Sequence, residues 1–365
     1  MNKEELSFIF NQFDQVAAFV EFQELNSGHI NDTFLIKTTE KPHYILQKIN
    51  GNVFKNVEAL IKNKVFISQH LQGKMNKFSK EYIHKNELCF TKAKSGAFFY
   101  KDNLENYWNL SFFIADSITY EKTPSKEIAF EAGKITGDFL NNTADVDCDE
   151  LETILPDFHS VTQRYNQFLE ALNTTSEKQK EQAKTLINFV QTHISKMQVL
   201  DVAIAEQKLP IRVTHNDTKI SNILFSKNQK AICLIDTDTV MPGVLHFDYG
   251  DAIRTICNAA DEDEKDINKV QFQMEYFKAY TLGFSERVKK SCTDNEIDYL
   301  PISIQILPFI MGLRFLTDFL NNNKYYKIKY PLHNFDRTQN QFALVTEIQT
   351  HFEEVKEYIS TVFKK

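Results

Sequence analysis

The sequence predicts an α+β protein with a small first lobe built on an antiparallel sheet and a larger, mainly helical second lobe. Three observations lead to this fold class. Strand patterns dominate residues 22–115, apolar residues recur at helical spacing after Ser117, and a strand-rich segment, 210–240, interrupts the helical half. We therefore expect two domains, 1–115 and 116–365, as the length of 365 residues also suggests.

In the first lobe, β-rich runs alternate with turn signals. Glu40-Lys-Pro separates two such runs, and the apolar residues Val57, Leu60 and Ile61 fall on one face of a helix. The elements expected here are a helix over 3–13, strands over 34–39 and 43–49, a helix over 52–72, and strands over 87–92 and 97–101, the last leading into 105–114.

In the second lobe, apolar stripes at a helical period dominate. The stripe that includes Ile128, Ala132 and Phe139 is typical of an amphipathic helix. Within the segment 210–240, we expect a hairpin with strands over 221–225 and 231–235. The other helices are expected over 160–172, 178–198, 249–259, 266–283, 295–320 and 339–363.

The charge balance and the glycine content exclude several classes of protein. Lys and Arg number 42 against 49 Asp and Glu, so the net charge is −7 and general binding to nucleic acid or to an anionic membrane is not expected. Only 10 residues are glycine, and they stand singly. A Rossmann dinucleotide motif and a P-loop are therefore both absent.

The cysteines and the first residues indicate the compartment. Five cysteines lie far apart in the sequence, without zinc-ligand spacing, which is typical of reduced thiols. The acidic start of the chain does not resemble a signal peptide, and no run of 18 apolar residues predicts a membrane span. We expect a cytoplasmic protein that is a monomer or a weak dimer.

The residues best suited to chemistry gather around the predicted hairpin. Asp217 lies on the loop before it, Asn222 at the start of one strand and Asp236 at the end of the other, with Lys219 nearby. Phosphoryl transfer needs such a set: a carboxylate at the acceptor hydroxyl, oxygen ligands for Mg²⁺ and a cation at the phosphate. Alone, the spacing of Asp217 and Asn222 is a weak signal, since such side chains also cap turns. Lys219 and Asp236 strengthen it.

The segment 215–222, His-Asn-Asp-Thr-Lys-Ile-Ser-Asn, together with Ile-Asp at 235–236, resembles the aminoglycoside phosphotransferase and choline kinase superfamily, relatives of the protein kinases. The sequence is most similar to bacterial N-acetylhexosamine 1-kinases. This similarity includes the segments 28–31, 44–47, 212–219, 235–239, 247–254, 312–316 and 329–334, in the order of that family. The resemblance implies a protein-kinase-like bilobal fold, with nucleotide bound by 1–115 and catalysis and substrate binding by 116–365.

The resemblance also implies roles and cofactors. Asp217 would orient or deprotonate the acceptor hydroxyl, and Lys219 would contact the transferring phosphate. Asn222 and Asp236 would bind Mg²⁺, with ATP as the phosphoryl donor. The reaction implied is transfer of the γ-phosphoryl group to the anomeric hydroxyl of N-acetylglucosamine or N-acetylgalactosamine. Asp238 is interpreted as structural or as support for the site, and Asp248, with Asp251, as a helix N-cap.

The predicted nucleotide site departs from the pattern of many kinases. Its loop, 26–32, has one glycine, so Asn31 and Thr33 are expected to contact phosphate. Gln47 stands at the strand position that usually holds a phosphate-binding lysine, as it does in the N-acetylhexosamine 1-kinases. Glu58 is then more plausibly a solvated charge than the partner of such a lysine. Adenine is expected to meet backbone groups near Phe113.

For the acceptor, the resemblance implies contacts from His29, Arg314 and Tyr325, with Tyr326 as a competing candidate. The alternative for Arg314 is an ordinary helical pair with Asp318. Two other functions stay open: a kinase of another small hydroxyl compound (choline, homoserine, methylthioribose or an aminoglycoside), or a nucleotide-binding pseudokinase. A cationic Arg314 in the pocket opposes choline and aminoglycosides. The intact Asp217, Asn222 and Asp236 oppose a pseudokinase.

Overall fold

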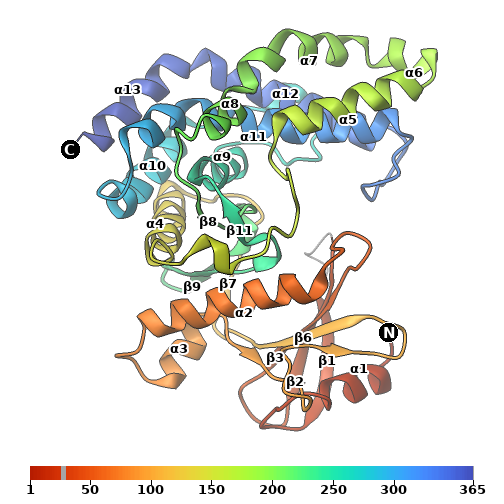
Figure 1. The fold of residues 1–365 in the computed structure, drawn as a ribbon, viewed down its shortest axis with the longest axis vertical. Helices are drawn as coiled ribbons and strands as arrows, with labels where there is room; N and C mark the ends of the chain where they lie inside the picture. Colours follow the sequence, from red (N-terminus) through yellow and green to blue (C-terminus); the bar gives the residue numbers. More distant parts are fainter. Residues whose placement is uncertain (26–29, 365) are drawn as a thin grey trace. The chain divides into compact units, whose positions relative to one another are not determined.

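The computed structural model describes residues 1–25 and 30–364, and it divides the chain into two compact units. Unit 1 consists of Met1–Ile118, Asn142–Leu155 and Leu224–Pro242; unit 2 consists of Thr119–Asn141, Pro156–Ile223 and Gly243–Lys365. The expected domains were continuous stretches of sequence, whereas these units are interleaved. Each unit is described by itself below (Figure 1).

Unit 1 is built on an antiparallel sheet in the order β1-β2-β3-β6-β4, with β5 paired to β6. On β2, alternate residues such as Phe34 and Ile36 are buried against helix α1, as expected for a sheet with one face in the core. The strands are β1 (Phe19–Leu25), β2 (Asp32–Thr38), β3 (Tyr44–Ile49), β4 (Phe90–Thr91), β5 (Tyr100–Lys101) and β6 (Tyr107–Phe112).

Three helices accompany this sheet. α1 (Lys3–Phe10) begins with a capping box between Asn2 and Glu5. α2 (Val57–Lys74) begins later than predicted, because the side chain of Asn56 caps its first turn. The strand predicted over 87–92 is largely wrong: the helix α3 (Lys80–Asn86) precedes it, and only the two residues of β4 pair with β6.

The predicted hairpin is present. β9 (Ile223–Ser226) pairs with β10 (Ala231–Leu234), and β7 (Ser117–Ile118) adds a third strand beside β9. Short 3₁₀ turns flank these strands: η2 (Ile220–Asn222) precedes β9, and η3 (Thr237–Thr239) follows β10.

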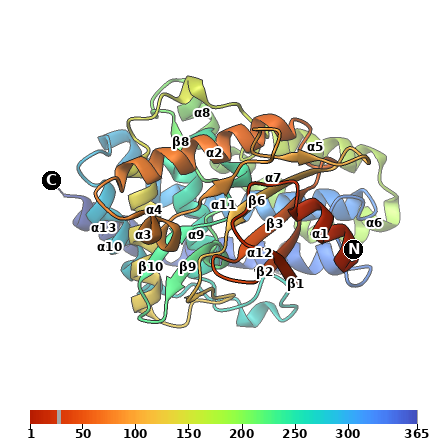
Figure 2. The same cartoon turned by 90° about the horizontal axis from the view of Figure 1, so that it is seen from below.

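Unit 2 is mainly helical, and its long helix α11 runs beside α12 in both views (Figures 1 and 2). Two predicted helices prove to be pairs, because 178–198 divides into α6 and α7 and the end of the chain divides into α12 and α13. The helices are α4 (Lys126–Asn142), α5 (Val161–Thr174), α6 (Glu177–Gln182), α7 (Lys184–Met197), α8 (Val199–Ala205), α9 (Leu245–Ile256), α10 (Met274–Val288), α11 (Asp294–Leu320), α12 (His333–Thr350) and α13 (Phe352–Phe363).

The remaining elements are short. They are the strands β8 (Arg212–Thr214) and β11 (Met241–Gly243) and the 3₁₀ turns η1 (Cys148–Glu150) and η4 (Ile267–Lys269). The helix predicted over 266–283 therefore begins only at Met274, after η4.

Two glycines let α4 and α10 approach closely. A Cβ atom on Gly133 would lie 2.0 Å from the carbonyl oxygen of Tyr280, and one on Gly283 would lie 2.1 Å from that of Phe130. Any side chain at either position would therefore force the helices apart. The few glycines of this sequence include two that close packing requires.

Helix α11 is long and apolar enough to cross a membrane by length and composition alone, with a mean hydropathy of 1.5 over its most apolar window. However, 78% of that window is buried inside the protein. The core helix of a globular protein passes the same test, so this is weak evidence for a membrane span.

Candidate active site

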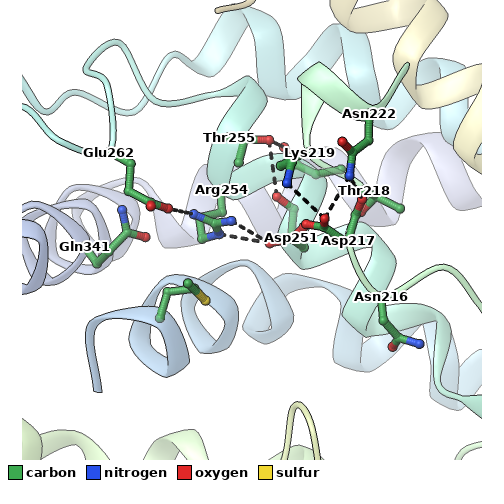
Figure 3. A network of polar contacts seen from close by, with 12 residues as sticks. Asn216, Asp217, Thr218, Lys219, Asn222, Asp251, Arg254, Thr255, Glu262 and Gln341 are labelled. Atoms are coloured by element: carbon green, nitrogen blue, oxygen red, sulfur yellow. Dashed lines mark hydrogen bonds and ion pairs between the residues drawn. The ribbon is translucent and has the colours of Figure 1, made fainter. Parts of the chain in front are cut away.

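In unit 2, the loop between β8 and η2 brings three predicted site residues together. The Asp217 carboxylate accepts a hydrogen bond from Lys219 Nζ at 3.0 Å and one from Asn222 Nδ2 at 2.8 Å (Figure 3). Asn222 Nδ2 also donates to the Asp217 carbonyl oxygen at 2.9 Å. The side chains of Asp217 and Lys219 are 27% and 26% exposed, so a ligand can reach them.

Asp248 of α9 holds this loop in shape. Its carboxylate accepts hydrogen bonds from the backbone N–H groups of His215 at 2.9 Å and Asn216 at 2.6 Å. The hydroxyl of Thr218 donates to the Asp248 carbonyl oxygen at 2.6 Å. The N-cap interpretation of Asp248 is wrong, because α9 begins at Leu245 and this carboxylate binds the loop instead. Burial raises the pKa of Asp248 to about 7.

A second chain of charges lies beside the loop. Arg254 Nε donates to Asp251 at 2.9 Å and Arg254 Nη1 to Glu262 at 2.7 Å (Figure 3). Burial and the nearby charge of Asp217 raise the pKa of Asp251, although Arg254 opposes this. Burial also acts to raise the pKa of Asp217, but the charge and hydrogen bond of Lys219 outweigh it and lower that pKa. Asp217 is therefore a carboxylate at neutral pH.

Arg314 of α11 lies among aromatic rings rather than beside an acid. Its guanidinium is 5.1 Å from the ring centre of Phe158 and 5.6 Å from that of Tyr326. The helical pair with Asp318 is not formed. Instead, the Asp318 carboxylate accepts the backbone N–H groups of Tyr325 at 2.8 Å and Tyr326 at 2.9 Å, and so shapes the loop after α11.

The two tyrosines differ in setting. Tyr325 is 59% exposed, whereas the Tyr326 hydroxyl is buried and has no hydrogen-bond partner among the described residues. Burial raises the pKa of Tyr326 to about 12, so it stays a neutral donor. Of the two tyrosines, it is the competing candidate, Tyr326, whose ring packs on Arg314.

Sequence reasoning missed two residues beside Arg314. His159, only 5% exposed, has its Nε2 atom 3.1 Å from the Asn216 carbonyl oxygen, and its Nδ1 atom has no partner in the described part of the chain. Burial lowers the pKa of His159 to about 3, so the ring is neutral. Burial and the charge of Arg314 lower the pKa of Arg164 to about 10. No local sequence pattern marks either residue.

In unit 1, four polar side chains meet that are far apart in sequence. Lys64 of α2 forms an ion pair with Asp238 and donates to Gln47 Oε1 on β3 at 3.0 Å. Asn31 donates to the other oxygen of Asp238 and accepts the backbone N–H of Asn50 at 2.8 Å. We call Asn31, Gln47, Lys64 and Asp238 the lysine network. Its one sequence signal is that Lys64 interrupts the apolar face of α2, four residues after Leu60.

The predicted nucleotide-site residues Thr33 and Phe113, and Glu58, which was expected to be a solvated charge, differ in their relation to this network. Thr33 pairs with Gln47 in the register of β2 and β3, so it is a neighbour of the network. The Phe113 N–H donates to the His43 carbonyl oxygen at 2.9 Å and is therefore already used within the sheet. Glu58 accepts a hydrogen bond from the exposed Tyr107 hydroxyl at 3.0 Å and has no part in the network.

The predicted Mg²⁺ ligands are consistent with a hard cation. Both hydrogen bonds of Asn222 leave from its amide nitrogen, so its oxygen remains for a metal. Asp236 sits between β10 and η3 in a left-handed conformation, with φ of 61°, a strain that is common at functional sites. The two belong to different units. His29 lies outside the described residues.

Comparisons with known proteins bear on the fold and on the family of this chain. Residues 115–281 match the APH family model, a phosphotransferase enzyme family. An aminoglycoside phosphotransferase from Alicyclobacillus acidocaldarius is 12% identical, with a TM-score of 0.63 over 97% of this chain and 96% of that one. A choline kinase from Cryptosporidium parvum is 12% identical, with a TM-score of 0.60 over 100% of both chains. A spectinomycin phosphotransferase, solved with ADP and spectinomycin, is 12% identical, with a TM-score of 0.59 over 96% of this chain and 99% of that one.

At these identities the solved structures establish the fold, which is kinase-like: a small antiparallel-sheet region and a larger helical region. Residues 115–281 resemble a phosphotransferase family, and this match, together with the fold, supports small-molecule phosphotransferase activity.

Proposed function

We propose that this protein is a kinase that transfers the γ-phosphoryl group of ATP to the anomeric hydroxyl of an N-acetylhexosamine, N-acetylglucosamine or N-acetylgalactosamine. The observation that carries the proposal is the loop in unit 2 where Asp217 receives hydrogen bonds from both Lys219 and Asn222. A lowered pKa keeps Asp217 ionised, with one oxygen, Oδ2, committed to these partners. The other oxygen is left to accept the acceptor's hydroxyl proton.

Each loop residue then has one task. Asp217 orients the anomeric hydroxyl and takes its proton as the phosphoryl group arrives. Lys219 places a positive charge beside the transferring phosphoryl group, which carries negative charge. Asn222 and Asp236 would each supply an oxygen ligand to Mg²⁺, which would neutralise phosphate charge when bound. Since phosphoryl transfer has a loose transition state, positioning and charge supply most of the acceleration.

The surroundings of Arg314 favour a neutral acceptor over an amine. The charge of Arg314 contributes to lowering the pKa of Arg164, and neither arginine forms an ion pair with an acid among the described residues. Similar solved structures are named for choline and ethanolamine kinases, and such cationic acceptors would be repelled here. Hydroxyls and an acetamide can instead accept from Arg314 and Tyr326 and donate to His159 Nδ1.

A screen of ADP release over several acceptors tests the proposal. The panel contains both N-acetylhexosamines, choline, homoserine, methylthioribose and an aminoglycoside, with Mg-ATP as the donor. We expect turnover with the hexosamines and a product phosphorylated at C1. Preference for an amine or for homoserine would overturn the acceptor assignment and keep the kinase. Nucleotide binding without turnover on any acceptor would support a pseudokinase.

A further inference from the structure

In the lysine network, the lysine comes from the helix rather than from the strand that carries it in protein kinases. In protein kinases, a lysine on the third strand contacts the α- and β-phosphates and pairs with a glutamate on the following helix. Here the strand β3 carries Gln47 and the helix α2 carries Lys64, with 3.0 Å between Lys64 Nζ and Gln47 Oε1. The positive charge therefore reaches the same strand position from the opposite element.

The ammonium of Lys64 is held rigidly. Lys64 is 4% exposed, and a buried charge is costly unless a counterion and hydrogen bonds surround it. Asp238, also 4% exposed, supplies the counterion. The preceding residue, Asn63, donates to the carbonyl oxygens of Glu152 at 2.8 Å and Val240 at 3.0 Å. These bonds fix α2 to the segment that carries Asp238.

The network also has an unused donor. An ammonium group has three N–H donors, and the described hydrogen bonds of Lys64 use two, one to Gln47 and one to Asp238. The Lys64 Nζ atom also lies 5.5 Å from the ring centre of Phe90, a contact that needs no N–H donor to an oxygen. The Asp238 carboxylate is shared, because Asn31 donates to its other oxygen. Asn31, in turn, belongs to the loop 26–32, for which phosphate contact is expected.

We propose that Lys64 replaces the missing strand lysine and binds a phosphate oxygen of the nucleotide, with Asp238 as its counterion and Gln47 as the group that orients it. This rests on the proposed function only in requiring that the protein bind a nucleoside phosphate. It explains how a kinase can carry glutamine at position 47. The opposing interpretation is that Lys64 and Asp238 form a structural ion pair.

Calorimetry with ADP and with adenosine separates the two, because adenosine has no phosphate. We expect Lys64→Met to weaken Mg-ADP binding by about tenfold or more, as for a lost charged hydrogen bond, and to leave adenosine affinity unchanged. Lys62→Gln, an exposed lysine on the same helix, is the matched control and should change neither. Unchanged ADP affinity in Lys64→Met, or equal losses for ADP and adenosine, would overturn the proposal.

A charge exchange covers the case in which Lys64→Met does not fold. The double variant Gln47→Lys/Lys64→Gln moves the lysine to the strand position usual in kinases and keeps the net charge. We expect it to bind ADP more tightly than Gln47→Ala/Lys64→Gln, with equal adenosine affinity. Equal ADP affinities of these two variants would contradict the proposal.

The outcomes also separate this inference from the proposed function. A selective loss of ADP affinity in a protein that phosphorylates no hexosamine would support Lys64 and refute the acceptor. Hexosamine phosphorylation with normal ADP binding in Lys64→Met would support the acceptor and refute the role of Lys64.

Discussion

The loop of unit 2 and the lysine network of unit 1 each join a lysine to an aspartate, by opposite routes. Lys219 lies two residues from Asp217, whereas 174 residues separate Lys64 from Asp238. The loop pair is about a quarter exposed, and the network pair is 4–5% exposed. The difference is that the loop pair stays accessible to a ligand, while the network pair is positioned by the core.

This contrast predicts that the buried pair governs stability and the exposed pair governs turnover. A buried charge that loses its partner is strongly destabilising, whereas an accessible one is resolvated by water. Four measurements test this contrast.

The largest expected effect is on stability. Asp238→Ala leaves the Lys64 ammonium buried without its carboxylate and should lower the free energy of unfolding by about 3–5 kcal/mol, measured in denaturant. The paired variant Lys64→Met/Asp238→Leu should be more stable than Asp238→Ala, since it removes both charges. A loss below about 1 kcal/mol, typical of a surface pair, would show that this pair is solvated.

The next effect is on catalysis. Asp217→Asn keeps the shape of the side chain but removes the base, so kcat should fall roughly 100-fold or more. The unfolding midpoint and the affinity for Mg-ADP should stay close to those of the wild type. Near-normal turnover would show that Asp217 does not act as the base. A large loss of stability would show that Asp217, like Asp238, is needed for folding.

The third effect is a pH dependence of the free energy of unfolding, caused by His159, whose ring contacts the loop at Asn216. Burial gives His159 a pKa of about 3 in the folded state, below its ordinary value of 6.5, so the unfolded chain binds more protons in acid. This group's contribution to stability is therefore lost as the pH falls from 6.5 toward 3, by about 2 kcal/mol between pH 8 and pH 5.

Asp248, with a pKa raised to about 7, opposes this trend, because its cost of burial falls as the pH decreases. The measurement is therefore a difference between proteins. His159→Phe should lose about 2 kcal/mol less unfolding free energy than the wild type between pH 8 and pH 5. Identical pH profiles would mean that His159 is solvated.

The smallest effect concerns the acceptor. Arg314→Ala should lower kcat/KM for the N-acetylhexosamine by about tenfold, as for one lost charged hydrogen bond, while the KM for ATP barely changes. Lys324→Ala, an exposed cation on the loop after α11, is a control for general electrostatics. Equal effects of the two substitutions would make Arg314 a distant charge rather than a binding group.

Local structure is the part of this protein that could be predicted from its sequence. The strands β2, β3, β9 and β10 and the helices α4, α5, α9 and α11 follow from periodicity and turn residues, because such signals act within a few residues. The loop that joins β8 to η2 follows for the same reason. Asp217, Lys219 and Asn222 are near neighbours in the chain, and a short loop leaves them little choice but to meet.

Tertiary structure decided the rest. Lys64 reads in sequence as a polar interruption of an apolar helix face, and Asp238 as a supporting acid. They become a buried ion pair only because the core brings α2 against the segment after β10, and no periodicity records a contact across 174 residues. His159 and Tyr326 likewise gain their settings from packing. Burial sets the cost of every unpaired charge, and burial belongs to the fold as a whole, so the lysine network and the surroundings of Arg314 could not be predicted from spacing alone.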